Sequence, residues 1–277
     1  LDLGEQPLAN NLLAPEDLGQ PEPRFPLRLA VCTECWLLQI TDLVPPVDLF
    51  SDYIYFSSYS DAWMQHASEC AARYSEDFTP NYVIEIASND GYLLRHFAEA
   101  NTSHLGIEPA ENIATVAREN GVQTRTEFFT KKLAQELATE NQPDLILANN
   151  VLAHAPDIND FVAGIKRLLA PEGRAILEFP YAAEMIAQDE FDTIYHEHVF
   201  YFTLIALEPI FARHALRITR VERTPLHGGS LRIFVRHDTH AADETVAVLR
   251  AQEDELGVGS LDYCQNFTAQ AAAIRET

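Results

Sequence analysis

The sequence is poor in positive charge. It holds 19 Lys and Arg against 42 Asp and Glu among 277 residues, which gives a formal net charge of −23. A surface of this sign repels a long polyanion, so we expect no nucleic acid polymer as a partner. A small phosphorylated ligand could still be held by local Arg side chains or by helix N-termini.

The chain also lacks a long apolar run and a secretory signal. We therefore expect no membrane partner and a cytoplasmic location. Its hydrophobic content of 47% suffices for one large domain with smaller appendages. The first residue is Leu1 rather than Met, and no terminating element precedes Thr277, so we expect missing sequence at both ends.

Cysteine is scarce, with four residues, and without a secretory signal we expect no disulfides. Cys32 and Cys35 form a CxxC pair, which is half of a tetrahedral zinc site. No second CxxC is present, and the candidate partners His66 and Cys70 lie in a helical pattern. A redox CxxC begins a helix, whereas residues 36–40 here have the pattern of a strand, which disfavours a redox role.

Apolar strands alternate with helical patterns along the chain, which predicts βα units on a parallel sheet, an α/β fold. We expect a hairpin around the CxxC, and an antiparallel closure of the sheet by residues 216–221 and 230–235. We divide the chain into residues 1–48, 49–237 and 238–277. The other predicted strands are residues 82–87, 104–108, 144–148 and 174–179, and the predicted helices are residues 60–77, 113–120, 131–140 and 158–169, with further helices from Tyr92 and from Asp238.

Glycine is sparse in the loop after the first strand of the predicted sheet, where ligands of such sheets bind. A dinucleotide site needs G-x-G-x-x-G there, and residues 88–91 offer only Gly91. Glu108 ends the next strand, about twenty residues later, where an acid typically takes ribose hydroxyls. The acidic, polar loop therefore suits a ligand without phosphate but with an ammonium or sulfonium group.

Proton-transfer groups are densest at Tyr195, His196, Glu197 and His198, which aromatic residues flank. Such a run beside apolar surface is typical of an acid/base site. A solvated polar loop or a metal-binding pair would give the same residue types. In a helix Tyr195 and His198 would share a face, whereas in a strand Tyr195 and Glu197 would, so the sequence leaves their division of labour open.

Residues 85–91 resemble the first motif of class I S-adenosylmethionine-dependent methyltransferases, which usually reads E/D-x-G-x-G-x-G. Ala87 and Asn89 stand where that motif has its first two glycines. Glu108 with Pro109 occupies the place of the family's ribose-binding acid.

Two further segments support the same resemblance. Residues 127–129 could meet an adenine, and residues 148–154 match the end of the family's fourth strand. The resemblance implies S-adenosylmethionine as the cofactor. The residues implied at its site are Glu85, Ala87, Asn89, Asp90, Gly91, Glu108, Pro109, Phe128, Asn149 and Asn150.

The chain as a whole resembles sugar C-methyltransferases, through residues 3–10, 53–60, 153–157, 195–198 and 227–230. Members of that family methylate a carbon of a nucleotide-bound keto-deoxysugar. The resemblance implies a Rossmann-like methyltransferase sheet, a small N-terminal zinc-binding domain and the start of a C-terminal domain that helps hold the nucleotide sugar. In the family four cysteines bind the zinc, and Cys32 and Cys35 match the second pair.

This resemblance implies a base that generates an enolate, whose carbon then takes the methyl group. We expect His198 as the base and Glu197 as its partner, orienting an imidazole or polarising the site. The other candidates are Tyr195 and Tyr55 as partners of the enolate or a hydroxyl, Tyr53 as a weaker alternative to Tyr55, His154 as a second acid or base, and His227 as support for the glycine turn after it.

Two alternatives stay open. An O- or N-methyltransferase of a small molecule would use the same cofactor site, with His198 deprotonating a hydroxyl. A nucleotide-binding scaffold without enzyme activity would use the His-Glu-His run to bind a metal. We expect a nucleotide-sugar partner and a monomer.

Overall fold

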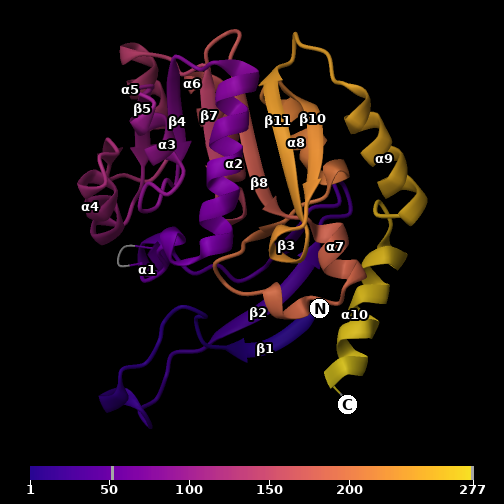
Figure 1. The fold of residues 1–277 in the computed structure, drawn as a ribbon. Coiled ribbons are helices and arrows are strands. Elements are labelled where there is room, and N and C mark those ends of the chain that lie inside the picture. Colours follow the sequence, from indigo (N-terminus) through magenta and orange to yellow (C-terminus); the bar gives the residue numbers. More distant parts are fainter. Residues whose placement is uncertain (51–52, 276–277) are drawn as a thin grey trace.

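A computed structural model describes residues 1–50 and 53–275, with the side chains of His227 and Arg275 outside the description (Figure 1). Its main feature is a seven-stranded sheet within that part of the chain. Five neighbouring strands are parallel, and two antiparallel strands extend one edge, as the sequence predicted. In spatial order the strands are β10 (Leu216–Thr224), β11 (Ser230–His237), β8 (Arg174–Pro180), β7 (Leu145–Asn149), β4 (Tyr82–Ile86), β5 (Ser103–Ile107) and β6 (Thr124–Arg125).

Helices cover both faces of this sheet (Figure 1). Alternate residues of β7 enter two different apolar clusters, since Leu145 and Leu147 belong to one, and Ile146 and Ala148 to the other. A strand buried on both faces needs such continuous apolar sequence. The first cluster includes residues of α2 (Asp61–Phe78) and α3 (Leu94–Glu99). The second includes residues of α5 (Lys131–Glu140), α6 (Ile158–Leu168) and α8 (Leu204–Arg213). Helix α4 (Glu111–Glu119) contacts β6.

A second, smaller sheet lies below the first (Figure 1). The predicted hairpin around the CxxC is confirmed as two of its strands. In spatial order this sheet contains β1 (Asp2–Gln6), β2 (Phe25–Val31), β3 (Leu38–Ile40) and β9 (Phe200–Tyr201). The last strand directly follows the Tyr-His-Glu-His run, so the N-terminal hairpin holds the end of that run in place. Two short helices, α1 (Pro46–Phe50) and α7 (Ala182–Ala187), lie near the junction of the sheets.

Two C-terminal helices, α9 (Glu244–Leu256) and α10 (Leu261–Arg275), follow the large sheet (Figure 1). The prediction of a helix from Asp238 was early by six residues, because the Asp243 side chain caps the helix that begins after it. Buried Glu253 of α9 accepts hydrogen bonds from the Tyr181 hydroxyl and from the first two backbone amides of α8. This carboxyl group therefore joins α9 to the body of the molecule.

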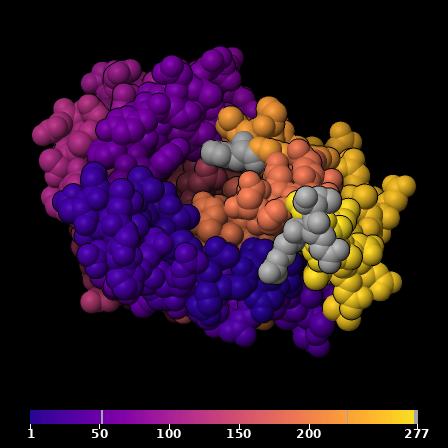
Figure 2. Space-filling view, turned by 90° about the horizontal axis from the view of Figure 1, so that it is seen from below, coloured from indigo at the N-terminus to yellow at the C-terminus, as the bar shows by residue number. Residues whose placement is uncertain are grey.

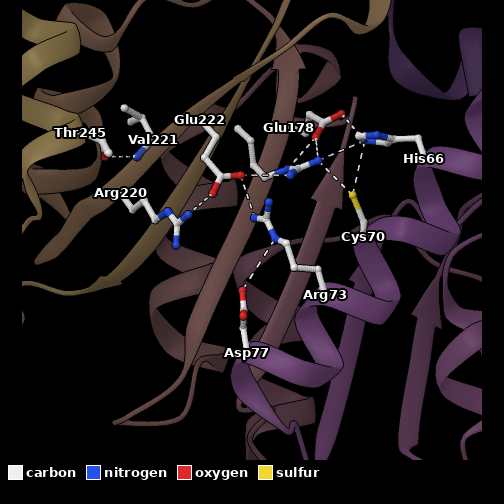
Figure 3. Close-up of polar contacts among 10 residues, drawn as sticks. His66, Cys70, Arg73, Asp77, Glu178, Arg220, Val221, Glu222 and Thr245 are labelled. Atoms are coloured by element: carbon white, nitrogen blue, oxygen red, sulfur yellow. Dashed lines mark hydrogen bonds and ion pairs between the residues drawn. The ribbon is translucent and has the colours of Figure 1, made fainter.

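His66 and Cys70, considered above as zinc partners, lie on α2 as expected and belong to a buried ion network (Figure 3). His66 Nε2 lies 2.9 Å from Glu178, and Arg232 donates to the same carboxylate at 2.8 Å. Arg232 also donates to the Cys70 sulfur at 3.0 Å. Burial opposes the charge on His66, yet its contacts with Cys70 and Glu178 raise its pKa to about 9. These side chains tie α2 to β8 and β11.

Within residues 1–50 and 53–275, no helix combines the length and the apolar character that crossing a bilayer requires. The remaining short helices are of the 3-10 type and occur at Pro15–Asp17, Ser57–Tyr59, Leu152–His154, Phe191–Thr193 and Leu226–Gly228.

Candidate active site

A cavity of about 840 Å³ opens at the carboxyl ends of β4, β5, β7 and β8, where ligands of such sheets bind. Seen from below, the molecule is hollowed between the N-terminal segment in indigo and the segments in purple and orange (Figure 2). Seven residues predicted at the cofactor site line the cavity: Ala87, Asn89, Glu108, Pro109, Phe128, Asn149 and Asn150. The other three, Glu85, Asp90 and Gly91, are buried behind them.

The loop after β4 takes the shape that glycines usually provide. Ala87 and Asn89 have φ angles of 56° and 48°, and Gly91 has 77°. These left-handed conformations cost a residue with a Cβ about 1–2 kcal/mol. A Cβ on Gly91 would lie 2.7 Å from a methyl group of Val122, so only glycine fits there. Ala87 and Asn89 thus adopt backbone conformations that glycine would adopt without strain.

Polar contacts hold this loop against the segment after α1. The side-chain oxygen of Asn89 accepts a hydrogen bond from the Ser57 amide at 2.8 Å, and its nitrogen donates to the carbonyl of Tyr55 at 3.1 Å. The Asp90 carboxylate accepts from the Ser58 amide at 3.2 Å. Asn89 and Asp90 therefore position the segment that carries Tyr55, as well as shaping the loop itself.

Glu108 fixes the loop from the neighbouring strand. Its two carboxylate oxygens accept hydrogen bonds from the amides of Asn89 at 3.0 Å and Ala110 at 2.9 Å. Burial raises the pKa of Glu108 to about 7, although both amides favour the ionised form. The carboxylate remains at the cavity wall, where it can accept further hydrogen bonds from ribose hydroxyls.

Glu85 lies fully buried under the same loop. Burial raises its pKa well above the usual range, and the neighbouring Tyr92 hydroxyl lowers it only in part. Tyr92 in turn accepts a hydrogen bond from Asn149 at 3.3 Å and lines the cavity. Glu85 thus lies beneath the loop, beside a tyrosine that lines the cavity.

The opposite side of the cavity carries the proton-transfer groups. The Tyr195 hydroxyl lies 3.0 Å from His198 Nε2, and His198 Nδ1 lies 3.2 Å from the Thr193 carbonyl. A carbonyl only accepts, so in the neutral ring Nδ1 carries the hydrogen and Nε2 has the lone pair. The His154 ring packs edge-on against His198, with centroids 4.9 Å apart. Burial lowers the pKa of His154 to about 4, which leaves this imidazole neutral at pH 7.

Glu197 is 3% exposed and lies behind the cavity wall. It accepts hydrogen bonds from the Asn10 amide at 2.6 Å and from the Tyr53 hydroxyl at 3.2 Å. Asn10 and Tyr53 both line the cavity, as does Tyr55, which is 46% exposed. Tyr53, ranked below Tyr55 by sequence, is thus the tyrosine bonded to Glu197. Asn10 belongs to residues 3–10, one of the segments that resemble the sugar C-methyltransferases. An asparagine at this position did not by itself predict a place in the active site.

The side chains of the His-Glu-His run have different partners. His196 is buried, lies 3.2 Å from the Pro26 carbonyl and packs against Phe25. Glu197 and His198 have the partners given above. Across the part of the chain that the structure describes, no three or more His, Cys, Asp or Glu side chains are arranged to hold a metal ion. The His196, Glu197 and His198 side chains thus contact different parts of the structure.

Cys32 and Cys35 lie in the tight turn between β2 and β3, with the Trp36 amide donating to the Cys32 carbonyl at 2.8 Å. Both side chains are partly accessible, as ligands of a site completed from outside the turn would be. The pair fits two of the four ligands of a structural zinc site.

Three family descriptions match consecutive parts of the chain. Residues 1–50 match a candidate zinc binding domain, residues 58–221 a methyltransferase domain, and residues 225–277 a C-methyltransferase C-terminal domain. The chain is also 34% identical to the C-methyltransferase NovU of Streptomyces niveus, over 99% of this chain and 67% of that protein.

Solved structures share the fold at low identity. Magnesium protoporphyrin IX methyltransferase from Synechocystis PCC 6803 with bound SAH matches with a TM-score of 0.50 and 17% identity, over 62% of this chain and 83% of that one. The PH0226 protein of Pyrococcus horikoshii OT3 matches with a TM-score of 0.51 and 12% identity, over 70% and 96%. With the sequence matches, these findings assign the chain to the C-methyltransferase family, as an S-adenosylmethionine-dependent enzyme of the class I fold.

Proposed function

We propose that the enzyme methylates a carbon of a nucleotide-linked keto-deoxysugar through an enolate. The observation that carries the proposal is the Tyr195–His198–His154 cluster, which faces the cofactor loops across one cavity. A hydroxyl acceptor needs one base, whereas an enolate needs a base and hydrogen-bond donors for its oxygen. The relation to NovU supports carbon as the acceptor atom.

In this proposal His198 Nε2 removes the proton next to the sugar carbonyl, while the Thr193 carbonyl orients the ring through Nδ1. The Tyr195 hydroxyl turns from Nε2 to the developing enolate oxygen. His154, neutral at pH 7, is a second donor or acceptor at the same place. S-adenosylmethionine, when bound, supplies an electrophilic methyl group on its sulfonium.

The cavity lining disfavours a negatively charged group near the reacting atoms. Its described residues include several aromatic rings but no Lys or Arg. A sugar ring can pack against aromatic side chains, whereas the phosphates of a nucleotide would gain no cationic partner among these residues. We therefore place the sugar ring inside the cavity and the nucleotide toward its mouth.

Proton exchange in deuterated water tests the carbon chemistry. The enzyme should exchange the proton next to the carbonyl of a nucleotide keto-deoxysugar, and His198→Asn should lose about 10²–10⁴ of that rate while keeping cofactor affinity. His104→Asn, at the amino end of β5, is the control and should behave like the wild type. Exchange at the wild-type rate in His198→Asn would assign the base elsewhere, with His154 tested next. Methylation of an alcohol without any C–H exchange would favour O-methyl transfer.

We further propose the division into residues 1–48, 49–237 and 238–277, with Cys32 and Cys35 as two ligands of a structural zinc ion. The hairpin turn that presents both sulfurs supports this assignment. The test is metal analysis of a longer protein that also carries the family's first cysteine pair, which should hold about one zinc per chain and lose it in Cys32→Ser. Equal zinc content in wild type and variant would remove this cysteine from the site.

A further inference from the structure

We infer that Asn10 is a positioning residue for methyl transfer, which holds the Glu197 side chain behind the active-site wall and favours its carboxylate form. Asn10 follows β1 in the N-terminal sheet, 187 positions before Glu197 along the chain. Its amide nitrogen nevertheless lies 2.6 Å from Glu197 Oε1, and its side chain lines the active-site cavity. The expected effect of Asn10 on the reaction rate rests on the proposed enolate mechanism, whereas its effect on the ionisation of Glu197 does not.

The donor and acceptor of this contact determine which form of Glu197 it stabilises. An amide nitrogen only donates, so its hydrogen bond stabilises the ionised form of the acid. Burial raises the pKa of Glu197, and the hydrogen bonds from Asn10 and then Tyr53 oppose that rise. Charge-assisted hydrogen bonds of this kind contribute more than neutral ones. Of the two hydrogen bonds, the one from Asn10 therefore opposes the rise in the pKa of Glu197 more strongly.

The groups that face Glu197 would respond to its charge. Tyr53 donates to it from the segment after α1, and Tyr195 lies near it within the same run. After burial, the negative charge of Glu197 is the next cause that raises the pKa of both phenols, which keeps them as hydroxyl donors. The His154 ring faces the Glu197 main chain.

A charged Glu197 would also favour the imidazolium that forms when the adjacent His198 takes a proton. If Glu197 became protonated, the imidazolium would lose a counter-charge and the Tyr53 hydroxyl would lose an anionic acceptor, although burial alone still keeps both phenols protonated. The variant Asn10→Leu should therefore be impaired near neutral pH and recover at higher pH, where Glu197 ionises without help.

Two measurements test the inference. The first is titration of Glu197 by NMR with ¹³C-labelled glutamate side chains, with the signal assigned from Glu197→Gln. Asn10→Leu should raise the pKa of Glu197 by at least about one unit, as expected for loss of a charge-assisted hydrogen bond to a buried acid. Asn10→Gln, which retains a donor, should restore most of the wild-type value. The exposed neighbour Asn11→Leu is the matched control and should leave the titration unchanged.

The second measurement is the pH profile of kcat, with cofactor affinity measured by calorimetry. The acidic limb of Asn10→Leu should move upward with the NMR shift, while cofactor affinity stays within about twofold. An unchanged Glu197 titration in folded Asn10→Leu overturns the inference, as does an equal loss of kcat at every pH. Because the NMR titration needs no sugar substrate, it decides the role of Asn10 even if the proposed acceptor proves wrong.

Discussion

At the residue scale, the charge of Glu108 should set the affinity for the cofactor. Its pKa is about 7, and a carboxylate accepts hydrogen bonds from ribose hydroxyls better than a carboxylic acid does. Affinity should therefore fall as the pH drops below 7, by up to about tenfold per unit. Glu108→Gln should weaken binding by about 1–3 kcal/mol and flatten this dependence.

Calorimetry between pH 6 and 8 checks this expectation. Glu111→Gln, an exposed acid on α4, removes the same charge nearby and should keep the wild-type profile. Equal affinity in wild type and Glu108→Gln would remove Glu108 from the binding site.

Glu85 should make stability depend on pH. Its pKa in the folded state is raised by burial, whereas in the unfolded chain a glutamate titrates near about 4.3. Its contribution to stability is thus fully present below about pH 4.3 and is lost as the pH rises through its folded pKa. Glu85→Gln cannot ionise, so at pH 8 it should be more stable than the wild type by about 1–2 kcal/mol.

Denaturant unfolding at pH 4 and pH 8 measures that difference. The gain of Glu85→Gln should be confined to the higher pH. A wild type that is more stable than the variant at pH 8 would show that the buried carboxylate is stabilised in the folded protein.

At the element scale, a glycine in place of Ala87 should relieve backbone strain in the turn after β4. Ala87 has a φ of 56°, which costs about 1–2 kcal/mol, while glycine loses about 0.5–1 kcal/mol of backbone entropy. Ala87→Gly should therefore raise the free energy of unfolding by about 0.5 kcal/mol. Ala148→Gly in the extended strand β7 should lower it, and the same unfolding curves compare the two. A loss in both variants would contradict the left-handed turn.

The elements that the sequence predicted are those with a local signal. Strand β4, the loop after it and helix α5 each have a signal within a few positions, which is an apolar pattern, turn residues or a capping residue. The structure contains all three. Helix α8 was missed because it is apolar on nearly all sides and contains Pro209. The two-residue strand β9 was missed because only its partner β3 makes it a strand.

The same limit applies to the site. The residues of the cofactor loops each follow a predicted parallel strand. Because the carboxyl ends of these strands meet at one edge of the sheet, the fold alone brings the residues together. The contact of Asn10 with Glu197 joins distant parts of the chain, and no local pattern encodes it. Likewise, the choice between Tyr53 and Tyr55 depends on which hydroxyl reaches a side chain of the other segment.

At the scale of the whole molecule, methyl transfer should require the small sheet as well as the large one. Strand β3 lies between β2 and β9, with Gln39 opposite Phe200. Gln39→Pro removes a backbone donor from a central strand, which is strongly destabilising. This variant should lose methyl transfer by at least about tenfold, since the Tyr-His-Glu-His run that we propose as catalytic ends just before β9.

Activity and thermal unfolding of the purified variants test this. Glu22→Pro, between Pro21 and Pro23 in the connection from β1 to β2, is the control and should keep both properties. Wild-type activity in Gln39→Pro would mean that the run holds its shape without the small sheet.

The shared sheet has a consequence for the history of such genes. The N-terminal sheet supplies the strand that neighbours β9, and the segment after β1 supplies, through Asn10, a hydrogen-bond partner for Glu197, which is encoded 187 codons later. A crossover that replaced only the codons of residues 1–50 with those of a diverged relative would separate residues that have to match. We expect natural recombinants of this enzyme to inherit both segments from one parent, and directed shuffling to succeed when the two are exchanged together.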